Sequence, residues 1–326
     1  MVIRLLQKAM LKEELAILSG NLDLALGTMA TPTLSAGGAG ATLPAATYSV
    51  IVVGLTLEGY QAWKAAGSSL TTGLVQTQAI TGADGGSYTL NGGMGQKSAA
   101  ATQAITLGQI LSCSVPAQAG VVAYAWYIAT AGAEKLERVT TLNSTTFSAP
   151  LAGTGQAASA MTANDRSTNT LAYNGLLTTA LKSGSGAYVN LLATGTPGTG
   201  TTLTSSGRGS VVEIDTMLQT MWDTYQVSPT VIFVNSQQIK DITNKVLSNA
   251  SAPLLQFFAD PAQGARAIAA GGGIEFYYNP FAAGGGYKIP ILIHPNVPPG
   301  VIVGWCEQLP AQYQSNQVPN VAEVKT

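Results

Sequence analysis

The pattern of apolar and polar positions is most regular between Ser210 and Leu247. Ser210 and Glu213 have the S-x-x-E spacing of a capping box, which predicts the start of a helix. Apolar residues follow at the spacing of one helix face, at Ile214, Leu218, Met221, Trp222 and Tyr225. We therefore expect a helix here, with Trp222 and Tyr225 packed in a core.

The next two elements follow directly along the chain. Ser228-Pro229 ends the helix, because proline disfavours helical geometry in the residue before it. The β-branched run Val231 to Val234 predicts a buried strand. Asn235 or Ser236 can cap a second helix, which places Ile239, Ile242 and Val246 on one face.

The N-terminal third changes character twice. Residues 2 to 18 predict a helix with Ile3, Leu6, Met10 and Ile17 on one face and Gly20 after its end. Thr31 to Leu43 is rich in Gly, Ala, Thr and Pro without a period, so we expect a linker.

Residues 46 to 150 contain short apolar stretches separated by Gly, Ser and Asn, which is typical of a β-sandwich of the immunoglobulin or fibronectin kind. Within Val121 to Ala129, large apolar residues alternate with small ones, which predicts a strand buried on one face. The other expected strands are Tyr48 to Leu57, Ser87 to Leu90, Ile110 to Val115, Lys135 to Leu142 and Thr145 to Ser148.

A second linker is expected at Leu151 to Asn169, before a short helix at Leu171 to Leu181 and a Gly/Ser/Thr-rich loop at Ser183 to Gly209. After the central unit, three strands are predicted, and the prolines among them favour sheet edges and short strands over a long central sheet. Alternating helices and strands make this part an α+β or α/β domain. The three strands are Ile274 to Tyr278, Ile289 to His294 and Val301 to Cys306.

Composition adds that the surface carries little charge. Charged residues make up 10% of the 326 residues and the net charge is −1, against about 25% charged residues in a typical soluble domain. Two explanations remain open, a surface covered by neighbouring copies or a secreted β protein. The near-neutral charge does not indicate a nucleic-acid or anionic-membrane binder. Charges in the first 14 residues argue against a signal peptide or membrane span there.

Motifs for cofactor or metal chemistry are weak. Gly195 to Gly200 and Gly271 to Gly273 lack the Lys-Ser/Thr of a phosphate-binding loop. His294 is the one histidine, without the His/Cys cluster of a metal site or the G-x-S-x-G of a hydrolase, and is expected to be structural. Cys113 and Cys306 fall in different predicted domains, so buried thiols are expected rather than a disulfide.

The acidic residues Glu213, Asp215 and Asp223 could form a pair for acid–base catalysis. The first two fit the acidic first turn of a helix equally well, and Asp223 lies outside the apolar stripe. Isolated cations do not form a basic track, and two glycosylation sequons are read as chance matches. These residues are Arg208, Lys240 and Lys245, with the sequons at Asn143 and Asn249. No catalytic, cofactor-binding or metal-binding residue is predicted.

Gly209 to Leu247 closely resembles the axial-domain segment of tailed-phage major capsid proteins with the Hong Kong 97-type fold. The matching phrases are Glu213-Ile214-Asp215, Trp222-Asp223-x-Tyr225, Ser228-Pro229-Thr230 and Val234-Asn235-Ser236-Gln237. Four other stretches are similar to further parts of the same family: the end of the spine helix, an inserted sandwich, the run-in to the axial domain and the returning strands. These are Leu11 to Asn21, Val122 to Phe147, Asn174 to Tyr188 and Ile289 to Val324.

The resemblance implies an α+β fold with four parts. Residues 1–45 would be the end of the spine helix and a linker, 46–150 an inserted immunoglobulin-like sandwich, 151–300 the axial domain, and 301–326 a strand returning to the peripheral domain. It implies a structural, non-enzymatic capsid subunit of the virion, made in the bacterial host cytoplasm. Its partners would be itself, in hexamers and pentamers, packaged DNA contacted non-specifically, and portal, scaffolding or decoration proteins, with no cofactor and no membrane.

The family's N-terminal arm and extended loop would precede Met1, and a further segment would follow Thr326, so a processed or truncated subunit is expected. Three other functions remain as alternatives. An encapsulin-like compartment shell would be distinguished by enzyme cargo, and a surface-adhesive or fibre protein would need an export signal. A carbohydrate hydrolase with an immunoglobulin-like accessory domain would need two opposed carboxylates in a cleft.

Overall fold

The computed structural model describes residues 2–161, 163–206, 209–247, 257–259, 266–268, 273–282 and 285–307. The chain is a mixed α+β protein, as expected, and divides into two compact units, Met1–Thr201 and Thr202–Thr326. The division falls inside the predicted loop at residues 183–209, so residues 151–201 belong with the sandwich rather than with the predicted axial domain.

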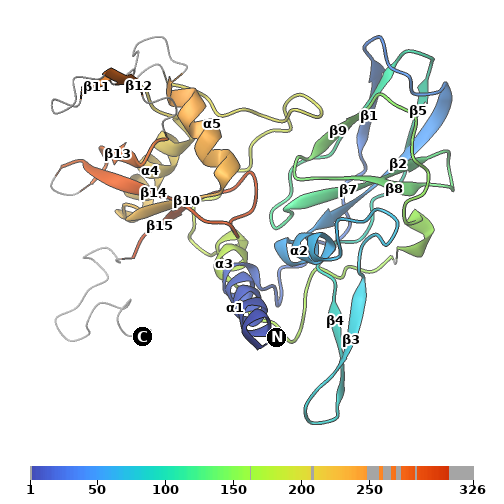
Figure 1. Ribbon diagram of the computed structural model, residues 1–326, viewed down its shortest axis with the longest axis horizontal. Coiled ribbons are helices and arrows are strands. Elements are labelled where there is room, and N and C mark those ends of the chain that lie inside the picture. The colour runs from blue at the N-terminus through green and yellow to red at the C-terminus, as the bar shows by residue number, and fades with distance from the viewer. Residues whose placement is uncertain are drawn as a thin grey trace. The chain divides into compact units, whose positions relative to one another are not determined.

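The first unit contains a sandwich of two antiparallel sheets (Figure 1). One sheet has the order β5-β2-β7-β8 and the other β1-β6-β9. The strands are β1 (Thr33–Gly37), β2 (Ala46–Leu55), β5 (Ala101–Ile105), β6 (Ile110–Ser114), β7 (Ala123–Ala129), β8 (Lys135–Thr140) and β9 (Ser144–Phe147).

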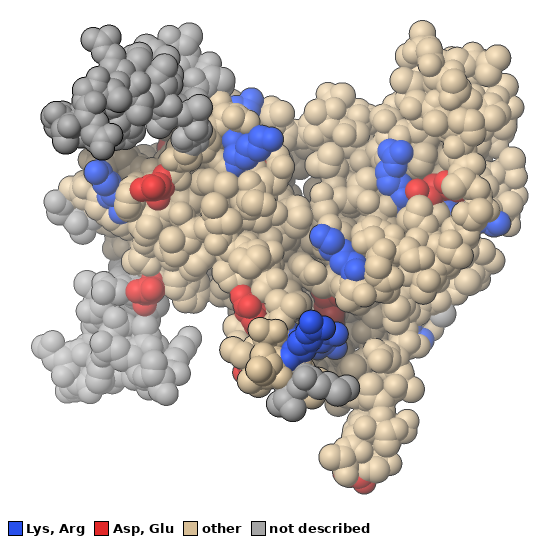
Figure 2. All heavy atoms as spheres, in the orientation of Figure 1, with Lys and Arg blue, Asp and Glu red and all other residues tan. Residues whose placement is uncertain are grey.

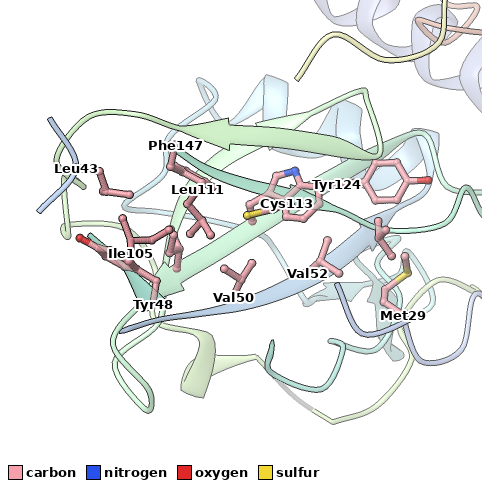
Figure 3. Close-up of a cluster of buried hydrophobic side chains, with 13 residues drawn as sticks. Met29, Leu43, Tyr48, Val50, Val52, Ile105, Leu111, Cys113, Tyr124 and Phe147 are labelled. Carbon is pink, nitrogen blue, oxygen red and sulfur yellow. The ribbon is translucent and has the colours of Figure 1, made fainter. Parts of the chain in front are cut away.

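Side chains from both sheets meet in one buried cluster (Figure 3). Val50 and Val52 of β2 and Trp126 of β7 face Leu111 and Cys113 of β6, and all five are buried completely. The Trp126 indole N–H donates to Thr140 Oγ1 at 2.8 Å, so the largest core side chain is also satisfied as a hydrogen-bond donor.

Strand β1 corrects the prediction of a linker at Thr31 to Leu43. It pairs with β6 from Thr33↔Ser114 to Gly37↔Ile110, and Leu43 is fully buried in the core. The small residues Ser35, Ala36 and Gly37 have weak strand propensity, so this strand exists because β6 offers it a partner.

Strand β7 is buried on both faces, not on one as predicted. Its second face, with Ala125 and Tyr127, packs in another cluster with Leu74, Met94 and Met161. Helix α2 (Leu57–Ala65), which the sequence pattern did not predict, contributes Tyr60 and Trp63 at the edge of that cluster. Thr56 caps this helix by accepting from Gly59 N–H.

The segments before and after the sandwich are hydrogen-bonded to each other. Asn169 N–H donates to Asn21 O and Gly175 N–H to Gly20 O, each at 2.8 Å. These bonds hold the end of α1 (Val2–Ser19) beside the start of α3 (Leu176–Leu181). Lys182 lies 2.7 Å from Asp23, and this contact, with a hydrogen bond from Asn174, lowers the pKa of Asp23.

The remaining elements of the first unit are a hairpin, β3 (Thr77–Thr81) with β4 (Ser87–Asn91), and a short 3-10 turn at Ala158–Ala160. The hairpin strands are mostly exposed.

The second unit is built on a sheet of order β13-β14-β10-β15 (Figure 1). Strand β10 (Val231–Val234) pairs parallel to β14 (Tyr287–Ile293) and antiparallel to β15 (Ile302–Trp305), while β13 (Phe276–Asn279) forms an edge. A separate pair joins β11 (Phe257–Ala259) and β12 (Arg266–Ile268). Strand β15 thus belongs to the same sheet as the predicted axial strands, although residues 301–326 were assigned to a different part.

Helices α4 (Val212–Tyr225) and α5 (Ser236–Leu247) both pack on one face of this sheet. Ile214 and Leu218 of α4 and Ile242 of α5 meet Ile232 and Ile291 in a single buried cluster. The predicted helix, buried strand and helix are therefore confirmed. Asn235 caps α5 as predicted, because its side-chain oxygen accepts from Gln237 and Gln238 N–H at 2.9 and 3.1 Å.

The three strands are short, as expected, with four, seven and four residues in β13, β14 and β15. Pro290 nevertheless lies in β14, an interior strand, rather than at an edge. It pairs with Phe276, the first residue of β13, and the parallel pairing with β10 begins one residue later, at Ile291. The missing N–H therefore falls where both ladders end.

Candidate interaction surfaces

The acidic residues at the start of α4 are used to hold the fold together. Asp215 accepts hydrogen bonds from Ser210 Oγ and from Tyr277 Oη, both at 2.6 Å, and the same tyrosine oxygen accepts from Val211 N–H at 2.9 Å. Burial and the hydrogen bond to Asp215 raise the pKa of Tyr277. This network ties strand β13 to the first turn of α4.

The predicted capping box at Ser210 and Glu213 is wrong. The residue before the helix is Val211, which makes no side-chain cap, and Ser210 bonds to Asp215 instead. Both carboxylate oxygens of Glu213 accept from Thr204 N–H at 3.0 Å, which holds the preceding loop. Glu213 and Asp215 do lie in the first turn, where the helix dipole favours them. Asp223 is exposed.

Trp222 and Tyr225 are only half-buried and lie outside the buried cluster of this unit, which corrects the expectation that both are core residues. The stripe turns away from the sheet in the last turn, where α4 ends with Gln226 in a left-handed conformation at φ 54°.

His294 takes part in local contacts after β14. Its backbone N–H donates to Val234 O at 2.8 Å, its Nδ1 accepts from Asn296 N–H at 3.3 Å, and its ring meets Phe233 edge-on. Within the part of the chain that the structure describes, no three His, Cys, Asp or Glu side chains come together as metal ligands.

The glycine-rich stretch at residues 195–200 forms a tight turn against the sandwich. Gly200 N–H donates to Thr196 O at 2.8 Å, and Gly198 N–H donates to Ser144 Oγ at 3.1 Å. The Asn143 amide of the first sequon donates to Val115 O and Thr194 Oγ1 at 2.8 and 2.9 Å. The backbone N–H groups of Gly198 and Gly200 and the Asn143 amide therefore bond to other groups of the fold.

Cys113 is buried and Cys306 is half-buried, and the two are not joined in a disulfide. Lys240 and Lys245 lie on α5. Arg208, Asn249 and residues 271–272 lie outside the described residues.

Helix α1 exposes most of its apolar side chains. Six of them are between 46% and 73% exposed, because only its last turn packs against α3 and its neighbours. They are Ile3, Leu5, Leu6, Met10, Leu11 and Ile17. We call Ile3, Leu6, Met10 and Ile17, which share one face, the α1 stripe.

The sheet of the second unit is uncovered by α4 and α5 on its other face. Every second residue of each strand points to that face. Four of these residues have large exposed side chains, with exposed fractions of 52% for Phe276, 61% for Tyr278, 48% for Leu292 and 38% for Trp305. Register pairs Leu292 with Phe233 and Phe233 with Val303, which places these on the same face. We call Phe233, Phe276, Tyr278, Leu292, Val303 and Trp305 the open sheet face.

Sequence reasoning missed this face, although a signal was present. In β14 apolar residues occupy both alternating sets of positions, with Ile289 and Ile291 on one side and Pro290 and Leu292 on the other. Such a strand is typical of a sheet buried on both faces. Here the second face is exposed at Phe276, Tyr278, Leu292 and Trp305, although Val231, which pairs with Trp305 on that face, is buried.

Charged side chains are sparse on the visible surface (Figure 2). The strands of the open sheet face contain one charged residue, Lys288. A partner that binds the α1 stripe or the open sheet face would therefore do so mainly by burying apolar side chains.

Comparisons with family models, with curated proteins and with solved structures find no match to this chain. Across the residues that the structure describes, no helix combines the length and the apolar character needed to cross a membrane.

Proposed function

We propose that this chain is the major capsid subunit of a tailed bacteriophage with the Hong Kong 97-type fold, and that copies of it assemble into the shell enclosing double-stranded DNA. The role is structural and needs no catalytic residue. The proposal takes its family from the resemblance at 209–247, and three observations support it.

The first observation is that the segment of resemblance forms one packed unit. Residues 212–247 are helix α4, strand β10 and helix α5 around one buried cluster. A subunit that repeats the same contacts around symmetry axes must present its surfaces in a fixed geometry, which a packed unit of this kind supports.

The second observation is that the sandwich lies between two chain positions that are close together in the structure. The chain leaves at Asn21 and returns at Asn169, which are hydrogen-bonded to each other. Strands β5-β2-β7-β8 have the order C′CFG of an immunoglobulin sheet, and β1-β6 pair as its B and E strands. Strand β9, last in the chain, lies beside β6 where such a domain has strand D. This arrangement fits a domain inserted into a subunit.

The observation that carries the proposal is the exposure of apolar surface on a charge-poor chain. The α1 stripe and the open sheet face are both exposed, and charged residues make up 10% of the sequence. Soluble monomers seldom expose apolar patches larger than a few hundred Å². Packing among many identical copies would cover both surfaces.

Electron microscopy of the purified recombinant chain tests the proposal. We expect rings or closed shells, and in particles from infected cells we expect nuclease-protected double-stranded DNA. A monomer at about 100 µM by sedimentation would contradict self-assembly. Shells that contain enzyme cargo instead of DNA would identify a cellular compartment and contradict the viral role.

A further inference from the structure

The stretch of chain that joins the two compact units is short. Each unit is one continuous segment, Met1–Thr201 or Thr202–Thr326, so the backbone passes from one to the other once. The residues on both sides of this point are bonded into the unit to which they belong, as the contacts below show. Any torsion angles that change the orientation of one unit against the other are therefore confined to a few bonds.

On the side of the first unit, the turn at residues 194–200 is held to the sandwich. Asn143 Nδ2 donates to Thr194 Oγ1 at 2.9 Å, and Gly198 N–H donates to Ser144 Oγ at 3.1 Å. Asn143 and Ser144 lie at the start of strand β9, so the turn moves with the sandwich.

Gly200 is the last residue that this turn holds in place. Its N–H donates to Thr196 O at 2.8 Å, and its φ of 80° is in the left-handed region. A Cβ at this position would lie 2.8 Å from Leu142 Cδ2. Glycine is needed both for the torsion angle and for the space, so Gly200 has a fixed conformation.

On the side of the second unit, the chain is held to α4 from Leu203 onward. Leu203 packs against the buried cluster of this unit. Thr204 N–H donates to the Glu213 carboxylate at 3.0 Å, and Thr204 O accepts from Val212 N–H at 2.9 Å. This segment therefore moves with α4.

Thr201 and Thr202 lie between the two anchored segments, and both are exposed. Within the described residues, the backbone N–H groups of these two threonines donate to no partner. Their side chains bond in opposite directions. Thr201 Oγ1 donates to Ala193 O in the first unit, and Thr202 Oγ1 accepts from Lys245 Nζ in the second unit at 3.4 Å. The bonds that remain free are those on either side of the peptide group that joins Thr201 to Thr202.

We propose that ψ of Thr201 and φ of Thr202 form a hinge, about which the two units turn as rigid bodies. Rotation about these two bonds breaks none of the hydrogen bonds described above and leaves each buried cluster intact. Hinges in proteins commonly consist of a few loop residues that absorb the change in φ and ψ. The sandwich can thus change its orientation without any rearrangement inside either unit. The inference concerns a single chain and does not depend on the proposed function.

Time-resolved energy transfer between two dyes measures this freedom. One dye is attached to a cysteine in place of Leu107, which is 77% exposed in the first unit, and the other to a cysteine in place of Gln219, which is exposed on α4. The background carries Cys306→Ser, and Cys113 is buried. The donor decay at nanomolar concentration gives the width of the distribution of distances between the dyes in isolated chains.

One variant restricts the hinge and another extends it. Thr202→Pro fixes φ of residue 202 near about −65° and restricts Thr201 to extended conformations. We expect it to narrow the distribution at least twofold. Two glycines inserted between Thr201 and Thr202 are expected to broaden it at least twofold, because they add unrestrained torsion angles.

A matched control carries the same two glycines between Asn190 and Leu191. This insertion lies in an exposed loop inside the first unit, so it should leave the distribution as in the wild type. Circular dichroism and the melting temperature should be unchanged in all three variants, because each change is at exposed residues whose backbone N–H groups donate to no partner within the described chain.

Two results would overturn the hinge. A wild-type distribution no wider than that of Thr202→Pro would show that the two units are fixed against each other. Equal broadening by the two insertions would show that the freedom lies elsewhere in the chain, and this comparison decides the question even if Thr202→Pro does not fold. Because single chains are observed, a failure of shell assembly would overturn the proposed function and leave this result unaffected.

Discussion

Tyr277 and Tyr278 are neighbours in strand β13 with opposite surroundings. Tyr277 is buried and its hydroxyl bonds to Asp215 and to Val211, whereas Tyr278 is 61% exposed on the open sheet face. Because side chains of a strand alternate between the two faces of a sheet, Tyr277 points into the core and Tyr278 points to the surface.

We expect Tyr277→Phe to lower the free energy of unfolding by about 1–3 kcal/mol, since it leaves Val211 N–H and an Asp215 oxygen without their partner. Tyr278→Phe, the matched control, should change it by less than about 0.5 kcal/mol. Urea denaturation of both variants measures the difference, and equal stabilities would contradict a structural role for the Asp215 network.

Cys113 shows how burial changes the chemistry of one side chain. Burial raises the pKa of the Cys113 thiol to about 12, although Arg138 nearby acts in the opposite direction. At pH 8 only about one molecule in 10⁴ then carries the reactive thiolate, compared with about one in ten for a thiol with a pKa of 9.0. The shift disappears on unfolding.

We therefore expect Cys113 to react with iodoacetamide about 10³-fold more slowly in the folded protein than in guanidinium chloride at pH 8. Peptide mass spectrometry after timed alkylation measures this rate, with the half-buried Cys306 as the internal comparison. Labelling of Cys113 at the unfolded rate would mean that the sandwich core is open.

At the scale of elements, the crossing of α1 and α3 depends on two glycines. A Cβ at Gly175 would lie 2.5 Å from Ser19 N and 2.7 Å from Gly20 N, closer than real Cβ contacts. Its backbone has ordinary torsion angles, φ −74° and ψ 178°, so the requirement is for space alone. This contact places α1, and with it the α1 stripe.

Gly175→Ala is expected to force the two backbones apart and to destabilise the first unit by about 1–3 kcal/mol. Hydrogen exchange should rise in the last turn of α1 before it rises in the sandwich. Gly37→Ala, where a Cβ meets nothing within 4 Å, is the control and should leave exchange unchanged. Unaltered protection of residues 15–20 in Gly175→Ala would disprove the close crossing.

For the whole molecule, the scarcity of charge predicts how assembly responds to salt. The two surfaces proposed to be covered by neighbouring copies, the α1 stripe and the open sheet face, are apolar, and the strands of the open sheet face contain one charged residue, Lys288. At 1 M salt the screening length falls to about 3 Å, which weakens exposed ion pairs and leaves apolar burial intact.

We expect the assembled wild type to persist when NaCl is raised from 0.05 M to 1 M, with a change in the association constant of less than about tenfold. Sedimentation velocity across this range provides the measurement, and circular dichroism at each salt concentration controls for effects on folding. Dissociation at 1 M NaCl would point to an electrostatic interface and contradict an apolar contact between copies.

The sequence by itself determined those helices and strands whose caps and apolar spacing lie within a few neighbouring residues. The period of Ile214 and Leu218, the Asn235 cap and the β-branched run at Val231 predicted α4, α5 and β10, because caps and periodicity act within a few residues. The same patterns also showed that no familiar catalytic motif is present in the sequence. The Ser210 capping box failed because the Glu213 carboxylate accepts from Thr204 N–H and Ser210 Oγ donates to Asp215.

Only the tertiary structure decided which segments of low strand propensity form strands, and which faces of the sheets and helices are covered. Strand β1 exists because β6 pairs with it, and β7 is buried twice because residues near Leu74 and Met161 return to its second face. The exposure of the α1 stripe and the open sheet face was decided in the same way, since each depends on where distant segments pack. Burial is a property of the whole arrangement, so the surfaces proposed to join copies of this chain could be recognised only after it was folded.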